Sequence, residues 1–347
     1  MTEPVTTDAL EEYLVGRFGT ETVAVRDLVK HPEGWSRNTY SFTATWDDEG
    51  ETTNRFVLRS EAEGGVLDTD LEKEYRVMDA AQETDAPVPR THWYEADPDV
   101  IGAPFFVVDH VSGEAPNTWR GSDRAMLEDA WETRNGLPEG FVDAAAEVHS
   151  MSPEDVPFME NPGVDGVVER ELDRWVGKYE SHDLRSEPIV DEAIRWFREN
   201  PPEIDELTVV HGDFRIGNML IDDGEITALL DWEMARLGDP MYDLGYSSMP
   251  YLAGKLIDEP TELVCAVADR EWYYDRYEEL TGRTVDRYAV EYWQAFAIFV
   301  MITILLTGVD RYDRGESDDV RQVWLQYPIP GLLEDLLEIL RNHVETA

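Results

Sequence analysis

Two neighbouring stretches of the sequence place acidic side chains directly beside short apolar runs. Residues 209–221 read VVHGDFRIGNMLI, and residues 230–244 read LDWEMARLGDPMYDL. The sequence DDG between them separates two apolar runs and is typical of a tight turn. These patterns predict a hairpin of two strands. The loop before the hairpin carries Asp213 and Asn218, and Asp231 lies where its second strand ends.

The order and spacing of these three polar residues suit phosphoryl transfer. That reaction needs a carboxylate to orient the attacking hydroxyl and accept its proton, and oxygen ligands for Mg²⁺, which neutralises charge on the β- and γ-phosphates. Asn218 follows Asp213 by five residues, and Asp231 follows Asn218 by 13. The spacing is that of a kinase catalytic loop followed by a metal-binding aspartate.

Hydrophobic patterning makes the first third of the chain rich in strands. Residues 39–46 alternate apolar and polar side chains, and residues 54–59 follow them after a DDEG turn, which predicts a hairpin. Residues 71–83 carry apolar side chains at helical spacing, and residues 105–108 form a short apolar run typical of a buried strand.

The pattern becomes mostly helical after this point. With 347 residues the chain exceeds the size at which a single core usually stops growing. We therefore expect a small sheet-and-helix lobe, residues 1–111, and a larger helical lobe, residues 112–347. A cleft between two such lobes is the natural place for a ligand.

The motif HGDxxxxN from His211 to Asn218, the DWE that begins at Asp231 and the GDPxxDL that begins at Gly238 together resemble the aminoglycoside phosphotransferase family, a branch of the protein-kinase-like fold. Within that family, HGDFR and LDWEMARLGDP look like the subgroup found fused to acyl-CoA dehydrogenases, which is associated with phosphorylating hydroxyacyl-CoA. The resemblance extends from about Gly34 to the C-terminal helices. It implies an α+β, protein-kinase-like fold with two lobes, and ATP and Mg²⁺ as cofactors.

The resemblance also implies roles for the residues of the two stretches. Asp213 is the expected catalytic base, Asn218 a metal ligand and Asp231 the main metal ligand. Arg215 is expected to contact the transferring phosphate as a fixed cation, with a surface ion pair as the alternative. His211 is expected to brace the loop.

Three further acids surround this set. We expect Asp239 and Asp243 to act as helix caps or loop braces rather than in catalysis. Glu233 lies beside the expected metal site, where a hydrogen-bonding brace and a metal ligand are both open. In the helical lobe, His149 follows a predicted helix and is expected to brace the lobe.

A kinase-like first lobe must also bind the phosphates of the nucleotide. The candidate phosphate loop is GWSRN, which supplies Gly34, Ser36 and Asn38; it holds one glycine, and an ordinary hairpin turn is the alternative. The candidate cation is Arg59, where a lysine is commoner, and an arginine keeps the charge but differs in geometry. Its expected partner is Glu74, with Glu72 as the alternate.

The adenine is expected to bind the segment that links the two lobes. Asp109 and Val111 follow the apolar run 105–108, and in this fold the main chain of the linker hydrogen-bonds the adenine. We therefore assign both residues to nucleotide binding through main-chain atoms.

The charge of the chain is extreme. Asp and Glu total 75 against 29 Lys and Arg, and the formal net charge is -46. Such a charge destabilises the compact state through self-repulsion unless concentrated salt screens it. The acids run along the whole length, which is typical of a protein from a salty cytoplasm. The charge argues against nucleic acid or an anionic membrane as a partner.

Other features favour a cytoplasmic protein. The single cysteine, Cys265, cannot form an internal disulfide. Residues 1–17 are acidic and lack the apolar core of a signal peptide. The longest apolar run, residues 295–306, is shorter than the roughly 20 residues that span a bilayer, so we expect a buried helix. We expect core packing for the aromatic side chains between Trp272 and Trp324.

The leading hypothesis is an ATP- and Mg²⁺-dependent kinase acting on a small-molecule hydroxyl: a hydroxyacyl thioester, a sugar, an amino alcohol or an aminoglycoside-like compound. The competing hypothesis is a pseudokinase-like nucleotide-binding module, which the lean phosphate loop and Arg59 motivate. A protein kinase is disfavoured, because only a few residues separate Asp231 from Gly238 and leave no room for a peptide-docking loop.

Overall fold

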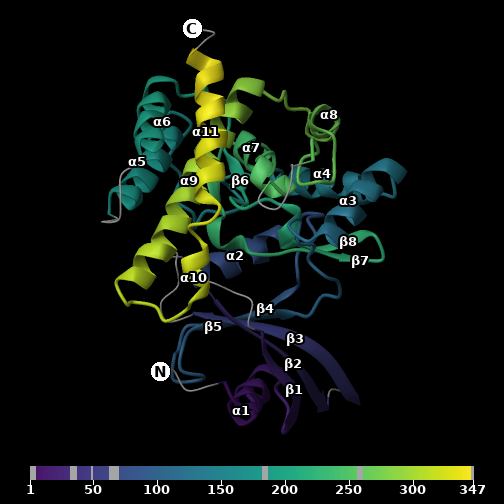
Figure 1. Ribbon diagram of the computed structural model, residues 1–347. Coiled ribbons are helices and arrows are strands. Elements are labelled where there is room, and N and C mark those ends of the chain that lie inside the picture. The colour runs from purple at the N-terminus through teal and green to yellow at the C-terminus, as the bar shows by residue number, and fades with distance from the viewer. Residues whose placement is uncertain are drawn as a thin grey trace.

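The computed structural model describes residues 5–31, 37–47, 50–61, 70–181, 187–255 and 261–344 (Figure 1). The first part of the chain forms a five-stranded antiparallel sheet with the strand order β1-β2-β3-β5-β4. Its strands are β1 (Val23–His31), β2 (Arg37–Asp47), β3 (Glu51–Glu61), β4 (Thr91–Glu95) and β5 (Phe105–Asp109). The predicted hairpin of residues 39–59 is the β2–β3 pair, and the predicted apolar strand is β5.

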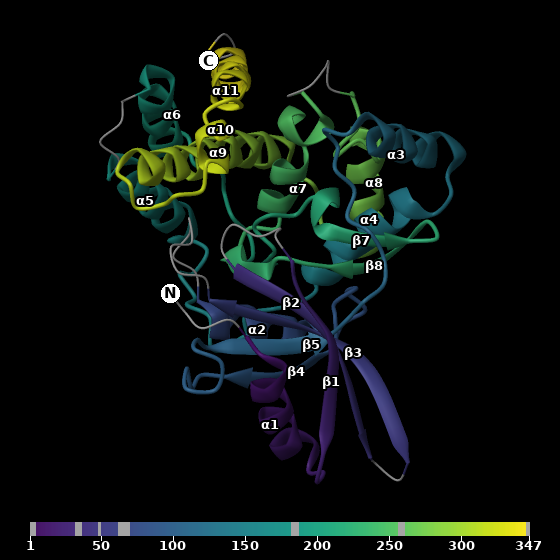
Figure 2. The same cartoon turned by 60° about the horizontal axis from the view of Figure 1, so that its bottom comes forward.

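Alternation along the strands gives the sheet two differently covered faces. One face packs against helix α1 (Thr7–Phe18), with Leu10 and Leu14 set against Phe42 and Phe56. The pattern analysis did not predict α1 or β1. The opposite side of the sheet is directed toward helix α2 (Leu71–Ala81) and the helical part of the molecule, as Figure 2 shows.

Helix α2 is the element that the spacing of residues 71–83 predicted. The Asp70 carboxylate caps its first turn by accepting the Lys73 N–H at 3.1 Å. Its buried face carries Val77 and Met78, and it also carries a fully buried acid, Glu74. A carboxylate at such a position requires a cationic partner.

Helices make up most of the second part of the chain. They are α3 (Gly121–Thr133), α4 (Leu137–Val148), α5 (Val167–Glu180), α6 (Pro188–Glu199), α7 (Met241–Ser247), α8 (Arg270–Thr281), α9 (Arg287–Asp313), α10 (Arg321–Trp324) and α11 (Ile329–Val344). Helix α9 lies among α5, α6, α7, α10 and α11 (Figure 1). Its side chains from Tyr292 to Val300 are buried, including Trp293 and Phe296.

Among the described residues, α9 is the single helix that is long and apolar enough to cross a membrane by length and composition. However, 78% of its most apolar window is buried inside the protein, as in the core helix of a globular protein. The prediction of a buried helix over residues 295–306 is confirmed, although the helix is longer than the apolar run. Core packing is also confirmed for most of the predicted aromatic residues, whereas Trp324 is 66% exposed.

The second part of the chain also contains two small two-stranded sheets. The predicted hairpin is β7 (Met219–Asp222) paired with β8 (Glu225–Leu229), and Asp223 and Gly224 in its turn have φ of 51° and 86°. A second pair, β6 (Thr208–Val210) with β9 (Arg236–Gly238), was not predicted. This second pair joins the start of the catalytic stretch to the segment that follows Asp231.

Candidate active site

The loop between β6 and β7 gathers Asp213, Arg215 and Asn218 around one carboxylate. Oδ1 of Asp213 accepts a hydrogen bond from Nε of Arg215 at 3.0 Å, and Oδ2 accepts one from Nδ2 of Asn218 at 2.7 Å. Nδ2 of Asn218 also donates to the Asp213 carbonyl at 2.9 Å. These contacts fix the orientation of the carboxylate, and its side chain remains 16% exposed, so a ligand can reach it.

Asp243, fully buried on α7, holds the start of this loop. Its Oδ2 accepts the His211 N–H at 2.7 Å, and its Oδ1 accepts the Gly212 N–H at 2.9 Å. His149, directly after α4, contacts Oδ2 through Nε2 at 3.0 Å and the Tyr277 hydroxyl through Nδ1 at 2.8 Å. Burial opposes ionisation of Asp243, but the His149 and backbone hydrogen bonds hold its pKa below the ordinary value. The bracing roles expected for Asp243 and His149 are confirmed.

His211 ties the loop to the strand that leads to Asp231. Its Nε2 contacts the Leu230 carbonyl at 3.0 Å, and the Asp213 N–H donates to its Nδ1 at 3.3 Å. Burial lowers the pKa of His211, so the ring is neutral with its proton on Nε2. The predicted bracing role is confirmed. Gly212 has φ of 85°, and a Cβ there would meet the Met234 carbonyl oxygen at 2.6 Å, which explains the glycine of the HGD motif.

Asp231 ends a row of alternating charges that crosses from the sheet to the catalytic stretch. Its Oδ1 accepts Nη2 of Arg59 at 3.0 Å, and Nη1 of Arg59 lies 2.9 Å from Oε1 of Glu74. The other oxygen of Glu74 pairs with Nε of Arg37 at 3.2 Å. Burial acts against ionisation of Asp231, but Arg59 lowers its pKa, so the carboxylate is charged. Asp231 itself has a left-handed backbone, with φ of 70°.

The expected pairing of Arg59 with Glu74 is confirmed, and the alternate is excluded. Glu72 is exposed and lies 3.7 Å from Arg76 on the outer side of α2. Sequence reasoning missed Arg37, the second cation on Glu74. Arg37 lies within the GWSRN segment, but its role depends on the register that pairs β2 with β3.

The structure describes some of the other residues that were predicted to bind the nucleotide. Gly34 and Ser36 lie outside the described residues. Asn38 donates through Nδ2 to the Glu61 carbonyl at 3.1 Å. The Asp109 N–H already donates to the Arg90 carbonyl at 2.8 Å, so this N–H is engaged within the protein.

The carboxylate of Asp109 has a structural task. It accepts Nδ2 of Asn54 at 2.8 Å and contacts Nε2 of His92 at 2.7 Å, and so holds the end of β5. The Val111 N–H, by contrast, donates to no acceptor in the part of the chain that the structure describes.

The chemistry of Asn218 and Asp231 fits Mg²⁺. Both present oxygen atoms, which that ion prefers, and Mg²⁺ takes few protein ligands because water and substrate phosphates complete its shell. Since Nδ2 of Asn218 is bound to Asp213, its Oδ1 is the atom available to a metal. The Leu230 N–H donates to the Asn218 carbonyl at 2.8 Å, which brings the two ligand segments together. No cluster of three or more His, Cys, Asp or Glu suited to a metal occurs among the described residues.

A second residue that sequence reasoning missed is Tyr246, on α7. Its buried hydroxyl lies beside Asp213 and Arg215, and burial together with the Asp213 carboxylate raises its pKa well above the ordinary value. The phenol therefore stays protonated and acts as a donor. Its position three residues after Asp243, on the same side of α7, was the one available signal.

Comparison with known proteins also indicates a phosphotransferase. The model of the phosphotransferase enzyme family matches residues 27–280. Acyl-CoA dehydrogenase family member 10 of Mus musculus is 28% identical over 249 residues, which cover 70% of this chain and 22% of that protein. Family member 11 of Homo sapiens is 29% identical over 252 residues, covering 70% and 31%. The chain thus spans between a fifth and a third of the length of these curated relatives.

Solved structures show the fold. A Ralstonia eutropha protein named as an aminoglycoside phosphotransferase superposes with a TM-score of 0.75 at 24% identity, covering 97% of this chain and 99% of that one. Macrolide 2′-phosphotransferase type I gives a TM-score of 0.57 at 19% identity, covering 96% and 99%. The predicted α+β, kinase-like fold is confirmed, with its small antiparallel sheet and its mainly helical second part. The prediction of an enzyme, a small-molecule phosphotransferase, agrees with the family match, and the chain belongs to the phosphotransferase enzyme family.

Proposed function

We propose that the protein transfers the γ-phosphate of ATP, with Mg²⁺, to a hydroxyl group of a small molecule. The observation that carries the proposal is the arrangement of Asp213, Asn218 and Asp231 on two adjacent segments, with Arg59 held against Asp231. Asp213 offers a carboxylate in a fixed orientation. Asn218 and Asp231 offer oxygen ligands for a metal, and Arg59 adds a cation beside Asp231. Phosphoryl transfer depends on such positioned charges more than on covalent chemistry.

Asp213 is the proposed catalytic base. Its carboxylate is held by Arg215 and Asn218, so it can orient the acceptor hydroxyl and take its proton. Burial opposes the charge of Arg215, but the Asp213 carboxylate raises the pKa of this guanidinium, which stays protonated. We propose that the same guanidinium contacts the transferring phosphate. Tyr246 supplies a neutral donor at the same place.

Asn218 and Asp231 would hold Mg²⁺, which would neutralise charge on the β- and γ-phosphates. Arg59, fixed by Glu74, would contact the phosphates from the sheet side. We propose that Gly34, Ser36 and Asn38 complete phosphate binding. Adenine binding falls to the Asp109 carbonyl and the Val111 N–H.

We further propose the division into a nucleotide-binding lobe, residues 1–111, and a catalytic lobe, residues 112–347. The similarity to the acyl-CoA dehydrogenase relatives supports a hydroxyacyl-CoA as the acceptor. Hygromycin-B 4-O-kinase of Escherichia coli is 34% identical to this chain over 95 residues. This similarity supports a sugar-like compound as the alternative acceptor. The net charge of -46 supports function in the concentrated salt of a halophile cytoplasm.

A nucleotide-binding module without activity is the second candidate. The observation in its favour is the ion pair of Arg59 with Asp231, which engages one of the proposed metal ligands. The two functions differ in one measurable respect: the enzyme needs Mg²⁺ and produces ADP, whereas the module binds the nucleotide and releases it unchanged.

The test is ADP release from ATP and Mg²⁺ in concentrated KCl with pooled hydroxyl compounds, hydroxyacyl-CoAs among them. Asp213→Asn removes the proposed base, and Asp222→Asn, the same change at an exposed position on β7, is the control. We expect acceptor-dependent release that falls by about 10²–10⁴ in Asp213→Asn and stays unchanged in Asp222→Asn. Undiminished release by Asp213→Asn would contradict the assignment, and nucleotide binding without ADP would favour the module.

A further inference from the structure

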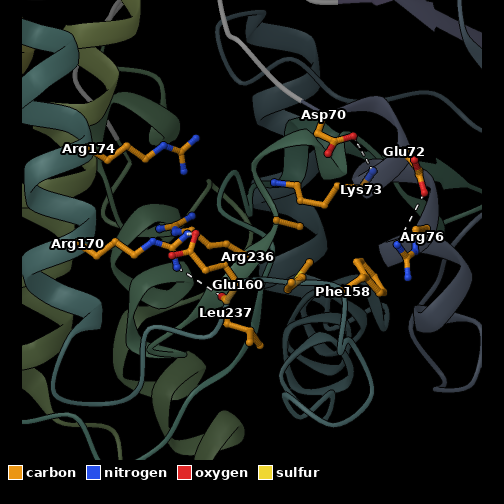
Figure 3. Close-up of a pocket in the computed structure, with 12 residues that line it drawn as sticks. Asp70, Glu72, Lys73, Arg76, Phe158, Glu160, Arg170, Arg174, Arg236 and Leu237 are labelled. Carbon is orange, nitrogen blue, oxygen red and sulfur yellow. Dashed lines mark hydrogen bonds and ion pairs between the residues drawn. The ribbon is translucent and has the colours of Figure 1, made fainter.

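A pocket of about 290 Å³ opens beside α2, outside the cluster around Asp213 (Figure 3). Its walls come from the first turns of α2, the segment before α5, the helix α5 itself and β9. Five of its 12 lining residues are basic: Lys73, Arg76, Arg170, Arg174 and Arg236. We call this set the basic pocket.

The residues that line the basic pocket carry a net positive charge, whereas the whole chain is strongly negative. Three of the lining residues are acidic against these five, whereas the whole chain has 75 acids and 29 bases. Only four lysines occur in the sequence, and Lys73 is one of them. Cations gathered in one cavity repel one another, so the arrangement is favourable only when an anion compensates them.

Three of the five cations are already paired with carboxylates. Nη2 of Arg170 lies 2.8 Å from Oε2 of Glu160, and Nε of Arg236 lies 2.9 Å from Oε2 of the buried Glu171. Arg76 has a looser contact with a neighbouring acid on its own helix. The first two pairs connect α5 with the segment before it and with β9, which are three walls of the pocket.

The other two cations, Lys73 and Arg174, form no ion pair with any carboxylate of the described segments. In Figure 3, the side chains of Lys73, Arg174 and Arg236 reach toward a shared space. Burial, together with the charges of the neighbouring Arg174 and Arg236, lowers the pKa of Lys73 to about 8. The Lys73 ammonium therefore lies beside two guanidinium groups and has no ion pair with a carboxylate among the described residues.

We propose that the basic pocket binds a phosphate group, distinct from the one transferred at Asp213, between Lys73 and Arg174. A guanidinium presents two parallel donors to phosphate oxygens, and an ammonium adds a compact charge. The phosphate belongs either to free inorganic phosphate or to a remote phosphate group of the acceptor. Both sources present the same phosphate group to Lys73 and Arg174, and binding measurements with different phosphate compounds distinguish them.

Two residues that line the pocket lie close in sequence to the proposed catalytic machinery. Lys73 precedes Glu74, the carboxylate that holds Arg59, and Arg236 follows Asp231 by five residues. A phosphate bound between Lys73 and Arg174 would join α2 to α5 and favour the position of α2 in which Glu74 contacts Arg59. This consequence rests on the proposed function, whereas the binding itself does not.

The first test is calorimetric titration with inorganic phosphate, without nucleotide or Mg²⁺, at constant ionic strength set by KCl. We expect saturable binding that weakens about tenfold in Lys73→Gln and in Arg174→Gln, since each loses a charge-assisted hydrogen bond. Lys178→Gln, on α5 but outside the pocket, should bind as the parent protein does. Thermal unfolding in the same salt checks that every variant is folded.

The second test compares coenzyme A with its dephospho form, which lacks the 3′-phosphate. Tighter binding of coenzyme A that is lost in Lys73→Gln would assign the pocket to the acceptor. Equal binding of the two, with saturable inorganic phosphate, would assign it to free phosphate. Absence of saturable binding of every probe, or binding unaffected by both variants, would overturn the proposal. These readouts need no turnover, so a failure of the kinase assay leaves them interpretable.

Discussion

The guanidinium of Arg59 contacts the carboxylate of Asp231 at 3.0 Å, although 172 positions of the chain separate the two residues. The same guanidinium lies 2.9 Å from Glu74, so one planar cation links β3, α2 and the end of β8. Burial opposes its charge, but Glu74 and Asp231 raise the pKa of Arg59, and it stays protonated. An arginine can make both contacts because its two terminal nitrogens diverge, which a lysine ammonium does not match.

We predict that Arg59→Lys weakens nucleotide binding by about tenfold, because one ammonium cannot keep both Glu74 and Asp231 in place. Titration with an ATP analogue, with and without Mg²⁺, measures the effect. Arg55→Lys, an exposed position on the same strand, serves as the control and should bind normally. Equal affinity in Arg59→Lys and Arg55→Lys would show that the double contact is not needed.

The crossing of α7 and α9 depends on Gly245. A Cβ at this position would lie 2.6 Å from both the Gln294 nitrogen and the Val290 oxygen, which are backbone atoms of α9. Gly245→Ala must therefore separate the two helices, and we expect a loss of about 1–3 kcal/mol or more in the free energy of unfolding. Denaturant titration in concentrated salt measures it.

Gly177 on α5 provides the matched control for this change. No atom lies within 4 Å of a Cβ added there, so Gly177→Ala should be neutral or stabilise by about 0.5–1 kcal/mol through helix propensity. If both variants unfold at the same denaturant concentration, the close approach of α7 to α9 is not a constraint on stability.

Asp239 predicts a specific pH dependence of stability. Burial raises its pKa from 3.8 to about 6, although the Met241 N–H and the Trp293 indole N–H donate to the carboxylate. Because the folded pKa is the higher one, the native state binds the proton more tightly than the unfolded state. The stability from this group is therefore complete below the unfolded pKa and is lost as the pH rises through about 6.

The measurement compares the parent with Asp239→Asn, since the other acids titrate alike in both. The difference in their free energies of unfolding should change by about 2–3 kcal/mol between pH 4 and pH 7, in favour of the parent at the lower pH. Asp275→Asn, exposed on α8, should show no such change. A pH-independent difference for Asp239→Asn would mean that the native pKa is ordinary.

The net charge of -46 predicts that the fold depends on salt. The screening length is about 3 Å at 1 M salt and about 30 Å at 0.01 M, so dilution exposes the acids to mutual repulsion. We expect cooperative unfolding, followed by circular dichroism, as KCl is lowered from molar to millimolar concentration, and refolding when it is restored. A protein that keeps its thermal midpoint across that range would contradict the halophile interpretation.

Local patterns were sufficient for the elements that carry the chemistry. Periodicity located α2 and the β2–β3 hairpin, and the DDG turn located the β7–β8 hairpin. Helix α1 was not predicted, because its charged residues obscure the apolar stripe of Leu10 and Leu14. The β6–β9 pair was missed because three-residue strands leave no periodic signal.

The sequence by itself determined which chemical groups the protein has and in what order: the carboxylate, the amide and the second acid of the catalytic stretch, and the excess of negative charge. These properties depend only on which residues are present and on short distances along the sequence. Only the tertiary structure decided that Glu74 and Asp231 share Arg59, that Asp243 holds the loop of Asp213, and that Lys73 and Arg174 face one cavity. Such contacts join distant segments, and they depend on how helices and sheets pack rather than on any local pattern.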